Sequence, residues 1–156
     1  MQRLILSLAA AVLMASAATA QTETPPVPSY DPAVTARIES VLGNPAPWQS
    51  AFTAIQAAVT ERDEEALAPY FSYETPLRVN GEEVALDSEF DLYEIYDSLF
   101  TPEIVTRITE QKYEDLFVNQ DGIMFGDGEV WLGGSCVDAS CSTVDVKIIA
   151  LQSTSQ

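Results

Sequence analysis

Apolar residues recur every three or four positions along the chain up to Gln111, which is the spacing of amphipathic helices. Asp31 and Thr101 each stand before a proline, and a short polar residue followed by proline is typical of a helix start. Gly43 and Pro69 supply stops. The pattern therefore predicts four helices: residues 32–42, 47–68, 88–100 and a shorter one from Pro102 that turns Ile104, Val105 and Ile108 inward.

Beyond Gln111 the spacing falls to two, which predicts strands over 113–118, 122–126, 129–135 and 143–151. Asp127-Gly128 is a strong hairpin turn signal between the second and third of these strands. It opposes Phe125 to Val130 and Met124 to Trp131. Because both faces of this pair carry apolar residues, we expect it to lie centrally in the sheet with cover on each face.

An earlier hairpin is predicted at Asn80-Gly81, which lies between alternating apolar residues. A two-residue turn there sets three opposing pairs: Val79 with Glu82, Arg78 with Glu83 and Leu77 with Val84. The element order of helices, hairpin, helices and final meander predicts one α+β domain over residues 31–152, with the N-terminal helices packed on one face of a curved antiparallel sheet.

The first 20 residues have the composition of a secretory signal peptide. Arg3 is followed by an apolar run from Leu4 to Ala17, and Ala18-Thr19-Ala20 fits a cleavage site, so we expect cleavage after Ala20. An uncleaved anchor is the alternative, but the run is shorter than the roughly 20 residues that span a bilayer. Residues 21–30, rich in proline and small polar residues, are expected to be a flexible leader. The protein is thus expected in the periplasm or outside the cell, without a membrane anchor after cleavage.

Charge restricts the partners of the chain. It has 24 acidic and 7 basic residues, and cleavage would remove Arg3 and take the net charge from −17 to −18. Such a charge repels nucleic acid and anionic lipid, so neither is expected as a partner. We interpret the acidic composition mainly as a means of keeping the protein soluble. Attraction of a basic partner is the less favoured alternative.

Cys136 and Cys141 lie in the stretch GGSCVDASC. In an oxidising compartment two cysteines usually pair, and a bridge here would close the end of a hairpin. A redox motif has two residues between its cysteines and this stretch has four. The chain has no histidine, which disfavours both a zinc site and an activated cysteine nucleophile. A structural disulfide is therefore predicted.

Metal and cofactor motifs are not found. The stretch NQDGIMFGDGE has two Asp-Gly pairs, but it fails to place oxygen ligands at alternating positions before either glycine, as a calcium loop requires. The glycines of GDGEVWLGG open no helix that would bind phosphate. We therefore predict neither a metal nor a cofactor.

Four stretches, FSYETPLRVNGEEV, YDSLFTPEI, DLFVNQDGIMFGDGEVWL and VKIIAL, resemble a group of small exported bacterial proteins of uncharacterised function. The element order is also similar to that of the NTF2-like (cystatin-like α+β cone) superfamily. The resemblance covers about residues 48–151 and implies a curved sheet and helices that enclose a pocket. Isomerases, dehydratases, hydrolases and simple binding proteins all share that fold, so it does not select a function.

Enzymes of this fold often use an aspartate, histidine or tyrosine inside the cone. Asp97, beside Tyr96 and on the same predicted helix as Tyr93, is the best acid–base candidate. A carboxyl group buried beside phenols would have a raised pKa and would act as a base. The alternative, an exposed helix carboxylate, is the more frequent situation for aspartate.

Other residues are candidates for binding. Arg78 would hold an anionic ligand or would pair with Glu82 or Glu83, and Met124 and Trp131 would line a pocket or pack in the core. Two hypotheses remain. The favoured one is a non-catalytic exported module that binds a small apolar ligand or an envelope protein. The other is a small NTF2-like enzyme of the isomerase or hydrolase type that uses a buried carboxylate and a tyrosine.

Overall fold

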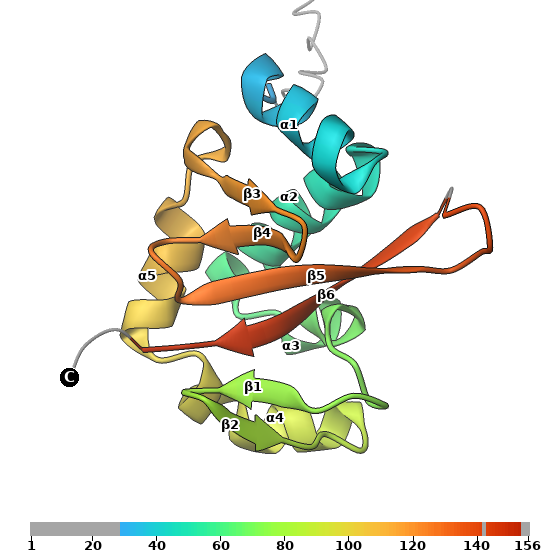
Figure 1. Ribbon diagram of the computed structural model, residues 1–156. Helices are drawn as coiled ribbons and strands as arrows, with labels where there is room; N and C mark the ends of the chain where they lie inside the picture. Colours follow the sequence, from blue (N-terminus) through green and yellow to red (C-terminus); the bar gives the residue numbers. More distant parts are fainter. Residues whose placement is uncertain (1–28, 142, 154–156) are drawn as a thin grey trace, which may run out of the picture.

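The computed structural model describes residues 29–141 and 143–153, and Figure 1 shows how their elements are arranged. The predicted signal peptide, residues 1–20, lies outside the described residues. The elements of the described part are α1 (Pro32–Leu42), α2 (Ala46–Glu61), α3 (Glu64–Leu67), a 3₁₀ turn η1 (Ala68–Tyr70), β1 (Leu77–Val79), β2 (Glu82–Val84), α4 (Glu89–Leu99), α5 (Pro102–Glu110), a 3₁₀ turn η2 (Tyr113–Asp115), β3 (Phe117–Asn119), β4 (Gly122–Phe125), β5 (Val130–Cys136) and β6 (Val144–Leu151).

The strands form one open sheet in the order β2-β1-β6-β5-β4-β3. Neighbouring strands are antiparallel except for β1 and β6, which are parallel and pair Arg78 with Ala150 and Val79 with Leu151. The α+β class is therefore confirmed, but the expectation of a wholly antiparallel sheet is wrong. β1 belongs to an early hairpin but lies beside β6, the last strand. A parallel pair needs a long connection, and the chain between β2 and β6, which includes α4 and α5, provides it.

The helices cover one side of the sheet. In Figure 1 they lie behind the strands, and no described helix lies over the side that faces the viewer, which we call the open face. Apolar side chains fill the space between helices and sheet: the Phe52 ring of α2 stacks on Phe125 of β4 at 5.3 Å and meets Tyr113 edge-on at 5.5 Å. All three are buried. This layer is the core of the domain.

The predicted helix over 47–68 is two helices. After α2, Arg62 takes a left-handed conformation with φ of 53° and ends the helix. Asp63 then caps α3, where its carboxylate accepts the Ala66 N–H. The prediction of a continuous helix is wrong because Asp63-Glu64-Glu65, an aspartate followed by two glutamates, is typical of a helix start.

Two of the predicted hairpins have the predicted register. Arg78 lies opposite Glu83 across the Asn80-Gly81 turn, and Phe125 lies opposite Val130 across the Asp127-Gly128 turn. The strand expected over 113–118 is wrong in its first half, because Tyr113–Asp115 forms η2 and the strand β3 begins only at Phe117.

The N-terminal end of the described chain is tied to the domain. The Tyr30 ring lies 4.8 Å from that of Tyr113, and its hydroxyl donates to the Gln49 carbonyl at 3.2 Å. The prediction that the leader extends to residue 30 is therefore wrong at Tyr30, which belongs to the fold. Residues 21–28 lie outside the described part. Asp31 caps α1 as predicted, accepting the Ala33 and Val34 N–H groups.

None of the helices in the described part of the chain combines the length and the apolar character needed to cross a bilayer.

Candidate binding face

A row of side chains crosses the open face from one edge of the sheet to the other. Each neighbouring pair is set by strand register, and side chains that are directly opposite lie on the same face of a sheet. The row consists of Phe117 (β3), Met124 (β4), Trp131 (β5), Ala150 (β6), Arg78 (β1) and Glu83 (β2). Three of the predicted pocket residues, Arg78, Met124 and Trp131, therefore lie on one surface.

Most apolar side chains of this row are partly open to solvent. Phe117 is 46% exposed, and Met124 and Trp131 are half-buried, whereas Ala150 is buried. Ile149, which neighbours Ala150 on β6, is 42% exposed. The Phe117 and Trp131 rings meet edge-on with centroids 6.1 Å apart. The expectation that β4 and β5 are covered on both faces is thus wrong within the described residues, because their second apolar face is the open one.

Two depressions of about 590 and about 520 Å³ lie side by side on the open face and are open to solvent. The first is lined by Arg78, Glu83, Trp131 and Ala150, among others. The second extends along β5 and β6 toward their projecting end. The two depressions share three lining residues, Thr75, Asp121 and Ile149, and therefore form one groove.

Arg78 is exposed and lies directly opposite Glu83, yet it makes no ion pair with another described residue. The predicted pairing partner is therefore in register but forms no ion pair with Arg78. Lys147, on the second depression, is engaged: its ammonium lies 3.3 Å from Asp145 and donates to the Pro69 carbonyl at 2.5 Å. The only cations that line the groove are therefore one engaged lysine and one arginine with no ion-pair partner among the described residues.

The proposed acid–base pair lies elsewhere, on α4. The Asp97 side chain is 78% exposed, and its carboxylate accepts a hydrogen bond from the Arg62 guanidinium at 2.6 Å. The premise of a buried carboxyl is thus wrong, and the common alternative of an exposed helix carboxylate describes Asp97. Tyr96 points into the core, where it stacks on Phe100 at 4.7 Å, and burial raises its pKa above the usual value. Tyr93, half-buried, packs edge-on against Phe90 at 6.1 Å. These residues do not join the groove.

Sequence reasoning missed a buried carboxylate. Glu129, in the turn between β4 and β5, has a side chain that is 0% exposed. One oxygen lies 2.9 Å from Nε of Arg107 on α5, and the other accepts the Asp127 N–H at 2.5 Å. A Cβ at Gly126 would lie 2.2 Å from the same carboxylate, so the turn leaves no room for a side chain at this position. Its contacts close a turn and attach it to a helix, which is a structural role.

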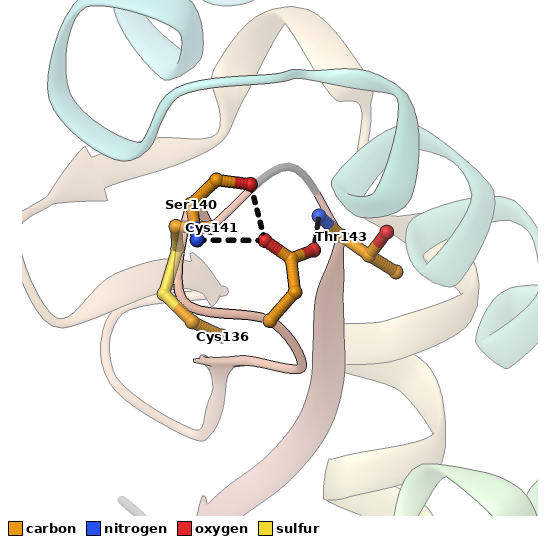
Figure 2. Close-up of a disulfide and its surroundings, with 5 residues drawn as sticks. Cys136, Ser140, Cys141 and Thr143 are labelled. Atoms are coloured by element: carbon orange, nitrogen blue, oxygen red, sulfur yellow. Dashed lines mark hydrogen bonds between the residues drawn. A yellow bond between two sulfur atoms is a disulfide. The ribbon is translucent and has the colours of Figure 1, made fainter.

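The predicted disulfide is confirmed. Cys136 and Cys141 are bonded, with their Cα atoms 4.7 Å apart, at the end of the β5–β6 hairpin (Figure 2). Asp138 organises the closed loop: one carboxylate oxygen accepts the Ser140 N–H at 2.9 Å and the other accepts the Thr143 N–H at 3.0 Å. Figure 1 shows this hairpin reaching past the rest of the sheet. The bridge therefore holds the tip of a projecting hairpin.

In residues 29–141 and 143–153, no group of three or more histidine, cysteine, aspartate or glutamate side chains is arranged to hold a metal ion. Comparisons of the chain with models of known protein families, with curated proteins and with solved structures gave no match.

Proposed function

We propose that this protein is an exported, non-catalytic binding module of the cell envelope, and that it binds a partner protein on the open face of its sheet. The observation that carries the proposal is the row of side chains that crosses all six strands on a face that no described helix covers. Phe117, Met124, Trp131 and Ile149 expose apolar surface on this face, and a contiguous exposed apolar surface with a polar rim is typical of an interaction site. Trp131 lies near the middle of the row, and tryptophan is enriched among the residues that dominate interfaces.

Export rests on the signal-peptide pattern of residues 1–20 and is supported by the disulfide. Bridges persist in oxidising compartments such as the periplasm and the extracellular space. The Cys136–Cys141 bridge lies on an exposed loop, where a reducing cytosol would have access to it. We therefore propose that the protein is cleaved after Ala20 and acts in the periplasm or outside the cell.

The fold is proposed to be NTF2-like, with helices on one side of a twisted sheet. In this chain the side chains of Phe52, Tyr113 and Phe125 occupy the space where a cone pocket would lie. Sites for small molecules are usually concave and bury most of the ligand surface. The groove on the open face is open along its length, which favours a protein partner over a small apolar ligand.

Site-specific photocrosslinking in the native host tests the proposal. A photoreactive residue in place of Phe117, which is 46% exposed on the open face, should give a crosslinked product of one discrete mass. The same residue in place of Glu94, which is exposed on α4 on the covered side, serves as the matched control. Equal products from both positions, or none from Phe117, would refute a binding function for this face.

A further inference from the structure

The groove on the open face has the shape of a site for an extended chain. Its two depressions run along β6, from which Asp145, Lys147, Ile149 and Ala150 line one or both of them. Six residues of strand extend about 20 Å, so the groove matches an extended segment of similar length. Trp131 and Ile149 give it an apolar floor, and Gly133 adds no side chain there; a Cβ at Gly133 would lie 2.9 Å from Ile149.

The charge around this floor is mainly negative. Four acidic residues line the groove: Glu74, Glu83, Asp121 and Asp145. Two basic residues line it, Arg78 and Lys147, and Lys147 is already paired with Asp145. Glu74 and Glu83 are exposed, and their carboxylates make no hydrogen bond or ion pair with another described residue. These carboxylates therefore lie at the rim of the groove and are open to solvent.

Resting on the proposed function, we propose that the occupant of the groove is an extended segment of a partner protein in which apolar residues alternate with lysine or arginine. Alternation is the period of an extended chain, which places every second side chain on the groove floor. The apolar residues would contact Trp131 and Ile149, and the cations would lie beside the rim carboxylates. Complementary charge of this kind accelerates association and excludes wrong partners.

The net charge of the whole protein argues against two other occupants. With 24 acidic and 7 basic residues, a second copy of this chain would bring another −17 charges to the face and would be repelled. An anionic segment would meet the same repulsion and would find only Arg78 as a cation with no ion-pair partner among the described residues lining the groove. A basic segment is attracted both by the rim and by the long-range field of the protein.

Three synthetic peptides of about 12 residues, long enough to span the groove, test the proposal. They share the same alternating valine and leucine residues and carry lysine, serine or glutamate at every other position. Binding is followed in ¹⁵N–¹H spectra of the isotope-labelled protein, in which the Trp131 indole N–H reports the groove. The Trp48 indole, 2% exposed in the core, is the internal reference. We expect the lysine peptide to shift Trp131 and to bind about tenfold or more tightly than the glutamate peptide.

Substitutions of charged residues test whether the carboxylates of Glu74 and Glu83 attract the lysine peptide. Glu74→Gln with Glu83→Gln should weaken binding of the lysine peptide about fivefold, because each rim charge in partly exposed surroundings contributes modestly. The matched control, Glu61→Gln with Glu94→Gln, removes the same charge from exposed positions on α2 and α4 and should change binding less than about twofold. Arg78→Gln removes the cation nearest the rim and should strengthen binding of the lysine peptide.

Apolar contact is tested separately. Trp131→Ala should weaken the lysine peptide about tenfold or more, and Phe117→Ser, at a position already 46% exposed, provides a second variant that leaves the core intact. The proposal is overturned if the three peptides bind equally, if none binds, or if Arg78→Gln abolishes binding of a preferred glutamate peptide. If Phe117 crosslinks to a partner but the peptides show no charge preference, the proposed binding function stands and the proposal of a basic segment is refuted.

Discussion

The buried carboxylate of Glu129 gives the most direct test of how the sheet is attached to its helices. The side chain is 0% exposed, and its carboxylate is 2.9 Å from the Arg107 guanidinium and 2.5 Å from the Asp127 amide nitrogen. Arg107 itself is 43% exposed, so it can turn to water when its partner is removed. We therefore predict that Arg107→Ala destabilises the fold more than Glu129→Gln does.

The magnitudes follow from this asymmetry. Removing one partner of a fully buried pair costs about 3–5 kcal/mol because a charge stays buried without compensation. Since Arg107 is half open to water, we expect Arg107→Ala to cost about 2–3 kcal/mol. Glu129→Gln keeps the shape of the side chain but weakens hydrogen bonds to a charged group, which costs about 1–2 kcal/mol. In the double variant the two losses should overlap by about 1 kcal/mol, because both substitutions break the same contact.

Urea unfolding, followed by circular dichroism and by tryptophan fluorescence, measures these free energies. The exposed pair of Arg62 and Asp97 is the control: with side chains 61% and 78% exposed, Asp97→Asn should change stability by less than about 0.5 kcal/mol. The reasoning fails if Arg107→Ala lies within about 0.5 kcal/mol of the wild type, or if the losses from the two single substitutions simply add.

Three further predictions concern stability. Replacing Cys136 and Cys141 with serine should cost about 2 kcal/mol in urea unfolding, since the bridge closes only a short loop; an unchanged midpoint would contradict this. Gly122→Ala should cost about 2–4 kcal/mol, because φ is +141° and the new Cβ would lie 1.8 Å from the Leu132 carbonyl oxygen; a thermal melt like that of the wild type would show that the turn adapts freely. Burial raises the pKa of Tyr96, so its contribution to stability is complete below the unfolded-state pKa and is lost as the pH rises through the folded-state pKa. Tyr96→Phe should therefore reduce the loss of stability above about pH 10, and equal losses in both proteins would refute it.

Local turn chemistry made the hairpins predictable from the sequence. Asn80-Gly81 demands positive φ at both turn positions, and the structure has φ of 50° and 86° there. That turn alone fixes Arg78 opposite Glu83. In the second hairpin Gly126 and Gly128 take positive φ, and the register around Asp127-Gly128 places Met124 opposite Trp131 as predicted. Short-range signals therefore paired four of the six residues in the row on the open face.

The parallel pairing of β1 with β6 was not predictable in this way. Arg78 and Ala150 are far apart in sequence, and nothing in their neighbourhoods specifies that they meet. Pairing over such a distance is decided by how the helices between them pack on the sheet. As a result, sequence reasoning named Arg78 and Trp131 separately as pocket candidates and did not show that they line one groove.

Burial of Glu129 escaped prediction for a related reason. Glutamate is almost never fully buried unless it is paired, and its partner, Arg107, lies on another element with no fixed sequence spacing. Asp97 was a catalytic candidate only on the condition that it is buried, and the helix instead turns its carboxylate outward to Arg62, as the more frequent alternative expected. Side chains on adjacent positions of a helix do not face each other, so Tyr96 in the core is compatible with an exposed Asp97.

The Arg107–Glu129 ion pair and the open face are connected through β5. Glu129 immediately precedes this strand, and its backbone carbonyl accepts the Gln152 N–H at 2.7 Å, next to the pairing of Val130 with Leu151. Because side chains alternate along a strand, a slip of one residue would turn Val130 outward and Trp131 into the core. In a shifted register the Glu129 carboxylate would lose its contact with Arg107, which opposes the slip. Fixing the register is the best-attested role of buried ionic groups. We therefore expect loss of the Arg107–Glu129 pair to weaken the register that keeps Trp131 on the open face, and a smaller shift of the Trp131 indole signal with the lysine peptide in Glu129→Gln would be its sign.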